Sequence, residues 1–199
     1  MNSFSTGEST PIKVLIPQNR LQERVSELGN EISQAFAEKD LAIVAILKGS
    51  FIFAADLLRA IKIPCSIDFM GISSYAGQPR SGVVQITKDL DQSIAGKNVL
   101  LVEDIIDTGL TATYLIHTLR QHRPASIDIC ALLDKSARRI IDVPIPYRGF
   151  EIPDVFVVGY GMDFQQQYRN LPDIVVLRSN GAPKTDVIQA DQASNKSES

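Results

Sequence analysis

The sequence lacks long hydrophobic runs and contains only two cysteines, Cys65 and Cys130. No apolar run reaches the roughly 20 residues that are needed to span a bilayer. The N-terminal stretch MNSFSTGESTPIK has no basic start followed by an apolar core, so we expect no signal peptide. Because each cysteine lies in an apolar stretch, we expect two buried thiols in a reducing compartment, the cytoplasm, rather than a disulfide or a metal-binding pair.

A large excess of one charge is absent as well. Twenty Lys and Arg residues stand against 23 Asp and Glu residues, which leaves a formal net charge of −3. Such a balance gives no general attraction to nucleic acid or to an anionic membrane. We therefore expect neither of them as a partner.

The composition is that of a soluble globular protein. Apolar residues make up 44% of the 199 residues and charged residues 22%, which excludes a disordered chain, a coiled coil and a collagen-like repeat. Residues 1–11 are polar, and residues 179–199 contain few large apolar residues and no aromatic residue. We expect a flexible N-terminus over 1–11 and a disordered tail over 179–199. Between them, we expect one folded domain over residues 12–178.

Short apolar runs alternate with segments of helical periodicity along this domain. The pattern predicts helices over 19–38, 51–61 and 111–122, a loop over 75–82, and strands over 41–47, 65–73, 83–88, 99–102, 126–133, 155–159 and 174–177. Strands that alternate with helices indicate an α/β fold with a parallel sheet covered on both faces. Since ligands of such sheets bind at the carboxyl ends of the strands, the residues that follow each strand are candidates for a site.

The segment that follows the predicted strand 99–102 combines an acidic pair, Glu103 and Asp104, with the loop Asp-Thr-Gly-Leu-Thr at 107–111. The carboxylates could accept hydrogen bonds from sugar hydroxyls or hold a hard divalent cation. Backbone N–H groups at a helix N-terminus, two hydroxyls and a permissive glycine suit a phosphate group. The alternative is that Asp107 and Thr108 only cap a helix. The acidic pair in front of the loop favours a site for a phosphorylated sugar.

This arrangement resembles the phosphoribosyl pyrophosphate (PRPP) motif of the type I phosphoribosyltransferases. Four further segments, in family order, look like those of the hypoxanthine-guanine phosphoribosyltransferases: LKGS at 47–50, SSY at 73–75, DK at 134–135 and VFVVGYGMD at 155–163. The resemblance covers residues 12–178. It implies the type I phosphoribosyltransferase fold, a mostly parallel twisted sheet flanked by helices with a small hood, and a homodimer or homotetramer.

The resemblance implies that one set of residues binds PRPP and Mg²⁺: Lys48, Gly49, Glu103, Asp104, Asp107, Thr108, Gly109, Leu110, Thr111, Asp163 and Arg169. The acidic pair would hold the ribose hydroxyls directly or through Mg²⁺, and loop 107–111 the 5′-phosphate. Lys48, Gly49 and Arg169 would bind pyrophosphate, and Asp163 would ligate a second Mg²⁺. Some family members carry Lys or Asn in place of Leu110, but the backbone N–H groups still serve the phosphate.

A second set of implied roles concerns the purine base. Lys135 would donate a hydrogen bond to a 6-oxo group, which selects hypoxanthine and guanine over adenine. Phe156 would stack on the ring, and Val157 would meet its edge through backbone groups. Asp107 is the candidate proton acceptor near N7. The segment around Ser74 and Tyr75 would form a mobile lid that excludes water.

Each motif also has an ordinary structural interpretation. Lys48 and Lys135 could be solvated lysines, Phe156 a core aromatic, and the segment around Tyr75 a surface hairpin. A PRPP-sensing regulator without turnover is the alternative from another functional class, but the sequence shows no helix-turn-helix pattern or basic stripe. A xanthine-preferring transferase is the nearest alternative among enzymes. The polar tail at 179–199 has no counterpart that we can assign.

Overall fold

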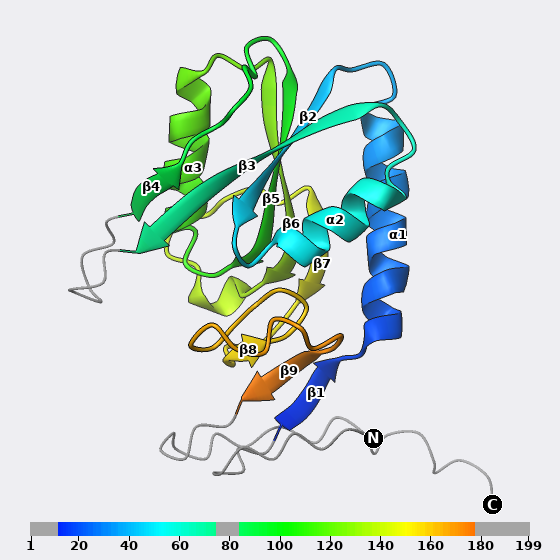
Figure 1. The fold of residues 1–199 in the computed structure, drawn as a ribbon, viewed down its shortest axis with the longest axis vertical. Helices are drawn as coiled ribbons and strands as arrows, with labels where there is room; N and C mark the ends of the chain where they lie inside the picture. Colours follow the sequence, from blue (N-terminus) through cyan, green and yellow to red (C-terminus); the bar gives the residue numbers. More distant parts are fainter. Residues whose placement is uncertain (1–11, 75–83, 178–199) are drawn as a thin grey trace, which may run out of the picture.

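A computed structural model describes residues 12–74 and 84–177 of the chain. Six strands form the main sheet in the order β4-β3-β2-β5-β6-β7, and three form a smaller sheet in the order β1-β9-β8 (Figure 1). The strands are β1 (Ile12–Ile16), β2 (Leu41–Leu47), β3 (Cys65–Ser74), β4 (Val84–Lys88), β5 (Asn98–Ile106), β6 (Ser126–Asp134), β7 (Tyr147–Glu151), β8 (Val157–Val158) and β9 (Ile174–Leu177). The helices are α1 (Gln18–Ala35), α2 (Phe51–Ala60), α3 (Leu110–Gln121) and the 3-10 turn η1 (Ser136–Arg138).

Helices cover both faces of the main sheet, as the alternating pattern predicts. One hydrophobic cluster joins α1 and α2 to the sheet, and a second joins α3 to the opposite face. The predicted stripe of α1 is buried, with Leu21, Leu28 and Ile32 each 0% exposed. Burying one such side chain contributes about 1.5–3 kcal/mol, which explains why the periodic residues fix the helix against the sheet. Strand β2 is buried along nearly its whole length, as expected for a central parallel strand.

The smaller sheet, which we call the hood, lies beyond the carboxyl ends of the parallel strands (Figure 1). It pairs β1 with β9 and β8 with β9, both antiparallel, so it joins the beginning of the described chain to its end. In the main sheet, only β4 runs antiparallel to its neighbour. The sheet is therefore mostly parallel, and the hood stands over the edge at which ligands of such sheets bind.

The structure corrects several predicted element bounds. The strand predicted over 99–102 runs from Asn98 to Ile106, and the strand predicted over 155–159 is only Val157–Val158. The helix predicted over 19–38 ends at Ala35. Strands β1 and β7 were not predicted. The sequence of β7, YRGFE, has no apolar run, and its strand conformation comes from pairing with β6.

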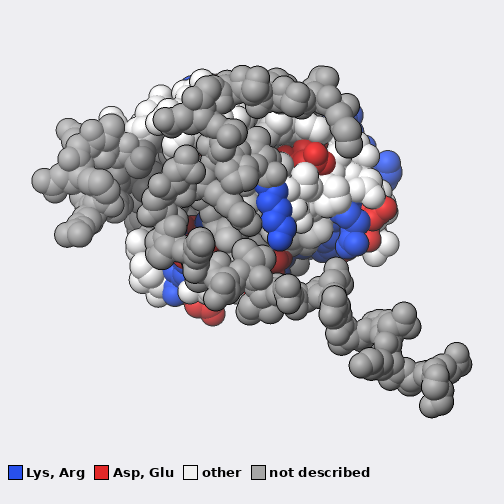
Figure 2. Space-filling view, turned by 90° about the horizontal axis from the view of Figure 1, so that it is seen from below, with Lys and Arg blue, Asp and Glu red and all other residues white. Residues whose placement is uncertain are grey.

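Both cysteines are free thiols; Cys130 is buried and Cys65 is half-buried. Burial raises the pKa of each thiol. None of the helices in the described ranges is long and apolar enough to cross a membrane. Figure 2, which views the molecule from the hood end, shows basic and acidic side chains next to one another on the coloured part of that face.

Candidate active site

The acidic pair lies inside strand β5 and not after it, which corrects the predicted position. Pairing with β6 continues past the pair, with Glu103 opposite Ala131 and Ile105 opposite Leu133. Because successive residues of a strand point to opposite faces, Glu103 and Asp104 are not presented side by side. Glu103 is only 6% exposed, and burial, with the neighbouring Asp104 charge, raises its pKa well above the usual range.

Asp104 faces the loop that follows β2. A Cβ atom added to Gly49 would lie 1.7 Å from Oδ2 of Asp104, so the loop backbone packs directly against this carboxylate. Burial raises the pKa of Asp104 to about 6, and the Asp163 carboxylate also raises it, whereas backbone N–H donors and the Arg169 guanidinium lower it. Asp104 is half-buried by its surface exposure, and cationic or hydroxyl groups bind such a carboxylate well because they replace its lost solvation.

The Lys48-Gly49 loop lies between β5 and the end of the hood. The peptide bond between Leu47 and Lys48 is cis, and the Lys48 side chain is exposed. The loop also packs closely against the segment after β8, since a Cβ atom on Gly161 would lie 2.3 Å from the carbonyl oxygen of Gly49. Because neither residue has a side chain, the Asp104 carboxylate, the Gly49 backbone and the Gly161 backbone can pack in direct contact.

Asp163 and Arg169 form an ion pair beside this stack. Arg169 Nη2 lies 2.7 Å from Asp163 Oδ1, and Arg169 Nη1 donates a hydrogen bond of 2.7 Å to the carbonyl of Gly161. The other Asp163 oxygen accepts a hydrogen bond from the Gln166 backbone N–H. Asp163 is thus held in place near Asp104, and Arg169 brings a cation to the same end of the sheet.

The residues predicted as Mg²⁺ ligands do not form a preassembled cage. Across residues 12–74 and 84–177, no group of three or more His, Cys, Asp or Glu side chains could hold a metal ion. Asp104 and Asp163 fit the way in which Mg²⁺ is usually bound, through one or two carboxylates together with substrate phosphates and water. Glu103, the third predicted ligand, lies on the opposite face of β5 from Asp104.

The loop at 107–111 begins helix α3. Gly109 is the N-cap residue with φ of 84°, and a Cβ atom there would lie 2.2 Å from the carbonyl oxygen of Ile141, so only glycine fits. The N-cap makes no side-chain hydrogen bond, and Thr108 Oγ1 accepts only a long one, 3.4 Å, from the Leu110 N–H. The loop therefore presents backbone N–H groups at the positive end of a helix, an arrangement that suits an anion as well as a cap.

Asp107 and Lys135 lie next to each other because β5 and β6 are neighbours. The Lys135 N–H donates a 2.9 Å hydrogen bond to the carbonyl of Ile106, the residue before Asp107. Lys135 is 6% exposed, so it is not a solvated surface lysine. Its Nζ lies 3.8 Å from Asp154 Oδ1. Within the described part of the chain, Oδ1 of Asp107 is buried and has no hydrogen-bond partner.

Phe156 lies just before β8 and not within a strand. It is 52% exposed, so the core interpretation of this aromatic is wrong, and it contacts Phe164 edge-on at 5.7 Å between ring centroids. The next residue, Val157, is buried and pairs with Val176 of β9. An exposed ring beside a buried strand leaves a flat apolar face free for a ligand.

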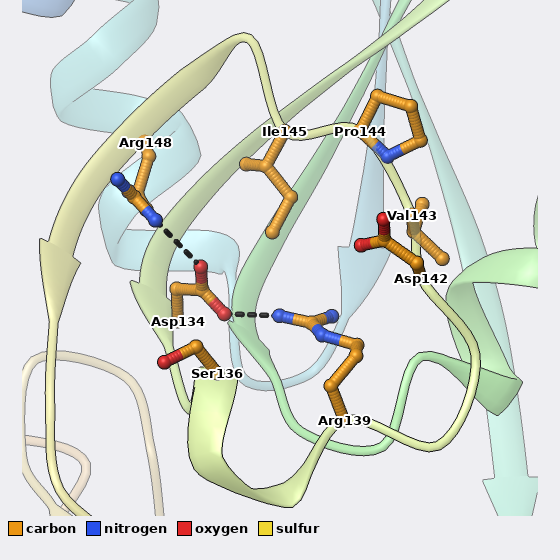
Figure 3. Close-up of a pocket in the computed structure, with 8 residues that line it drawn as sticks. All are labelled: Asp134, Ser136, Arg139, Asp142, Val143, Pro144, Ile145 and Arg148. Carbon is orange, nitrogen blue, oxygen red and sulfur yellow. Dashed lines mark hydrogen bonds and ion pairs between the residues drawn. The ribbon is translucent and has the colours of Figure 1, made fainter.

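A cavity of about 390 Å³ opens beside this group of residues, but it shares none of the predicted site residues. It is lined by Asp134, Ser136, Arg139, Asp142, Val143, Pro144, Ile145 and Arg148. Figure 3 shows the Asp134 carboxylate held between Arg139 and Arg148, with Arg148 Nη1 at 3.1 Å from Oδ2. Because none of the predicted site residues lines this cavity, we treat it as separate from the candidate site.

Part of the predicted site falls outside the residues that the structure describes. Tyr75 and the loop predicted over 75–82 are not among the described residues, and Ser74 is described only as the last residue of β3, opposite Val84. The expected flexible N-terminus at 1–11 and disordered tail at 179–199 also fall outside the residues that the structure describes.

Sequence reasoning missed two charged residues at the site, Arg138 and Asp154. Arg138 Nη1 lies 3.1 Å from Asp107 Oδ2 and 3.7 Å from Asp154 Oδ1. The position of Arg138 three residues after Lys135 was a usable signal, because a short turn brings such residues to one side. Asp154 gave no signal, since its proximity depends on the path of the chain after β7.

Comparisons with known proteins find relatives over most of the chain. A family model described as "Phosphoribosyl transferase domain" matches residues 17–165. The chain is 50% identical over 164 residues to the hypoxanthine phosphoribosyltransferase of Haemophilus influenzae, covering 80% of this chain and 92% of that protein. It is 45% identical over 167 residues to the hypoxanthine-guanine phosphoribosyltransferase of Bacillus subtilis, covering 83% and 93%.

A solved structure confirms the predicted fold. The crystal structure of a hypoxanthine-guanine phosphoribosyltransferase from Bacillus anthracis matches with a TM-score of 0.80 at 47% identity, covering 83% of this chain and 98% of that one. That structure holds a HEPES molecule in its active site. The chain belongs to the phosphoribosyltransferase family, in the group whose named members are hypoxanthine and hypoxanthine-guanine phosphoribosyltransferases.

Proposed function

We propose that the protein transfers the 5-phosphoribosyl group from PRPP to N9 of hypoxanthine or guanine, giving IMP or GMP and pyrophosphate. The observation that carries this proposal is the hydrogen bond from Lys135 N–H to the Ile106 carbonyl. This bond places the loop at 107–111, which suits a phosphate group, next to a buried lysine that can only donate hydrogen bonds. A phosphorylated sugar and a 6-oxopurine are the two ligands that such a pair of neighbours suits.

The PRPP end of the site would orient the sugar for attack. The backbone N–H groups at the start of α3 hold the 5′-phosphate, and the Asp104 carboxylate accepts hydrogen bonds from the ribose hydroxyls. Lys48, Gly49 and Arg169 bind the pyrophosphate group. Glu103, on the opposite face of β5, supports the position of Asp104 in the strand.

Asp104 and Asp163 would hold Mg²⁺ together with oxygen atoms of PRPP. When bound, Mg²⁺ neutralises charge that develops on the leaving pyrophosphate. Arg169 adds a fixed cation at the same end of the site, where its two hydrogen-bonded partners keep the guanidinium in place.

The base end of the site would select the purine and remove its proton. Lys135 donates to the 6-oxo group, and the exposed Phe156 ring stacks on the base. As N9 forms its bond to C1′ of the ribose, the bond from C1′ to the pyrophosphate oxygen breaks. The proton on N7 passes to Oδ1 of Asp107, the oxygen that is buried without a partner in the described structure.

The test is a spectrophotometric assay with Mg²⁺, PRPP and each of hypoxanthine, guanine, xanthine and adenine. Conversion of hypoxanthine and guanine but not adenine supports the proposal. Conversion of xanthine as well widens the substrate class without changing the mechanism. If no base is converted while PRPP still binds, the protein is the PRPP-sensing regulator and not an enzyme of this kind.

Assembly and location complete the proposal. We propose a homodimer or homotetramer in the cytoplasm, without nucleic acid or membrane as a partner. Sedimentation equilibrium of the purified chain would give the assembly directly, and a monomer at micromolar concentration would contradict it.

A further inference from the structure

Arg138 lies between two acidic residues, the candidate proton acceptor Asp107 and the Lys135 neighbour Asp154. Its Nη1 atom is 3.1 Å from Oδ2 of Asp107 and 3.7 Å from Oδ1 of Asp154. Asp154 in turn lies 3.8 Å from the Nζ atom of Lys135. One guanidinium therefore connects the candidate proton acceptor to the candidate reader of the 6-oxo group.

The backbone holds Arg138 in register with Lys135. Both belong to the turn that follows β6, and the Arg138 N–H donates a 3.0 Å hydrogen bond to the Lys135 carbonyl. The Lys135 N–H is itself bonded to Ile106, next to Asp107. Movement of the Arg138 backbone is thereby limited to small displacements relative to both residues.

The two oxygens of Asp107 have different surroundings. Oδ2 is paired with Arg138, whereas Oδ1 is buried and unpartnered among the residues that the structure describes. A carboxylate that is tethered through one oxygen cannot rotate freely about its side-chain bond. The tether therefore leaves Oδ1 as the oxygen that is free to accept a proton.

We propose that Arg138 is a positioning residue for the transfer, and this inference rests on the proposed function. Its guanidinium fixes the Asp107 carboxylate so that Oδ1 faces N7 of the purine. Through Asp154 it also sets the spacing between that oxygen and the Lys135 ammonium group. An arginine suits this task because its planar fork carries a permanent charge and several donors in fixed directions.

Arg138 contributes little to the free energy of unfolding, in contrast to its proposed effect on turnover. The side chains of Arg138 and Asp107 are 46% and 37% exposed, and ion pairs at such exposure add little to stability. Loss of Arg138 should therefore change turnover without unfolding the protein. That separation makes the inference testable by kinetics.

The chain offers a matched control in Arg148. Its Nη1 atom also lies 3.1 Å from a carboxylate oxygen, Oδ2 of Asp134, and its side chain is also 46% exposed. That pair lines the cavity of Figure 3, to which none of the proposed site residues contributes. Arg138→Gln and Arg148→Gln thus remove arginines of equal exposure from ion pairs of equal length, although Asp134 is 5% exposed and Asp107 37%. Only the Arg138 pair includes a proposed reacting atom.

The experiment measures kcat and KM for hypoxanthine and for PRPP in the full chain and its variants, with thermal unfolding as a check on folding. Arg138→Gln should lower kcat about tenfold, since displacements of a fraction of an ångström at reacting groups have effects of this size. KM for PRPP should stay within about twofold, because Asp107 acts on the base and not on the pyrophosphate. Arg138→Lys should recover part of the loss, and Arg148→Gln should match the wild type.

Three results would overturn the inference. They are a wild-type kcat in Arg138→Gln, an equal loss of kcat in Arg138→Gln and Arg148→Gln, and a loss that appears only as a higher KM for PRPP. Each of these leaves the proposed function intact, because the wild-type chain still converts the base. A wild-type chain that converts none of the four bases would overturn the proposed function and this inference with it.

Discussion

Replacement of Gly49 by alanine should disable the PRPP end of the site. The added Cβ atom would lie 1.7 Å from Oδ2, 2.5 Å from Cγ and 3.0 Å from Oδ1 of Asp104. Ordinary van der Waals contact begins at 3.4 Å, so the carboxylate or the loop has to move by about 1.7 Å. The Gly49 carbonyl oxygen also packs against Gly161, where an added Cβ atom would lie 2.3 Å from it.

The size of the effect follows from that displacement. A misplacement of about 1 Å at a positioned group costs roughly 100-fold in rate. We therefore expect kcat/KM for PRPP to fall about 100-fold or more in Gly49→Ala, a loss of about 2.7 kcal/mol of transition-state stabilisation. The assay is PRPP-dependent conversion of hypoxanthine, with PRPP varied at saturating base.

A second glycine provides the control. Gly96 has a φ of 74° and nothing within 4 Å of an added Cβ atom, so Gly96→Ala strains the backbone without touching the site. It should lower the free energy of unfolding by about 1 kcal/mol and leave kcat/KM unchanged. If Gly49→Ala has wild-type kinetics, or if Gly96→Ala loses as much activity, the argument from close packing at Asp104 is wrong.

Three further predictions concern single residues. Asp107→Ala should lower kcat sharply while PRPP binding, measured by calorimetry, largely remains; unchanged turnover would remove Asp107 from the reaction. Folding raises the pKa of Asp104 from 3.8 to about 6, so this residue favours the folded state below pH 3.8 and its contribution is lost as pH rises through about 6. Urea unfolding should therefore show the wild type losing stability relative to Asp104→Asn between pH 4 and pH 7, and parallel curves would contradict the shift. Tyr160→Phe removes the hydroxyl that donates to Asp56 on α2; it should lower the free energy of unfolding by about 1 kcal/mol and raise KM for PRPP, because this bond joins the end of the hood to the helix that follows Gly49.

Local sequence alone determined the parts of the fold that depend on nearby residues. The apolar run at 41–47 predicts β2, and the spacing of Leu21, Leu28 and Ile32 predicts α1, because each pattern reports the environment of its own segment. The loop at 107–111 was likewise readable, since Gly109 and the start of α3 lie next to each other in the chain. The resemblance of five separate motifs to one family added the expected roles of the site residues.

Tertiary structure alone decided which of these residues meet. The hood exists because β9 pairs with β1 across most of the chain, and no local pattern encodes such a partner. Pairing between β5 and β6 extends β5 through Ile106, which places Glu103 and Asp104 on opposite faces instead of together at a strand end. The contacts of Arg138 with Asp107 and Asp154 also join segments that are distant in sequence. Local residue patterns report the burial and backbone preference of a segment, whereas the chemistry of this site depends on long-range packing that brings separate segments within hydrogen-bonding distance.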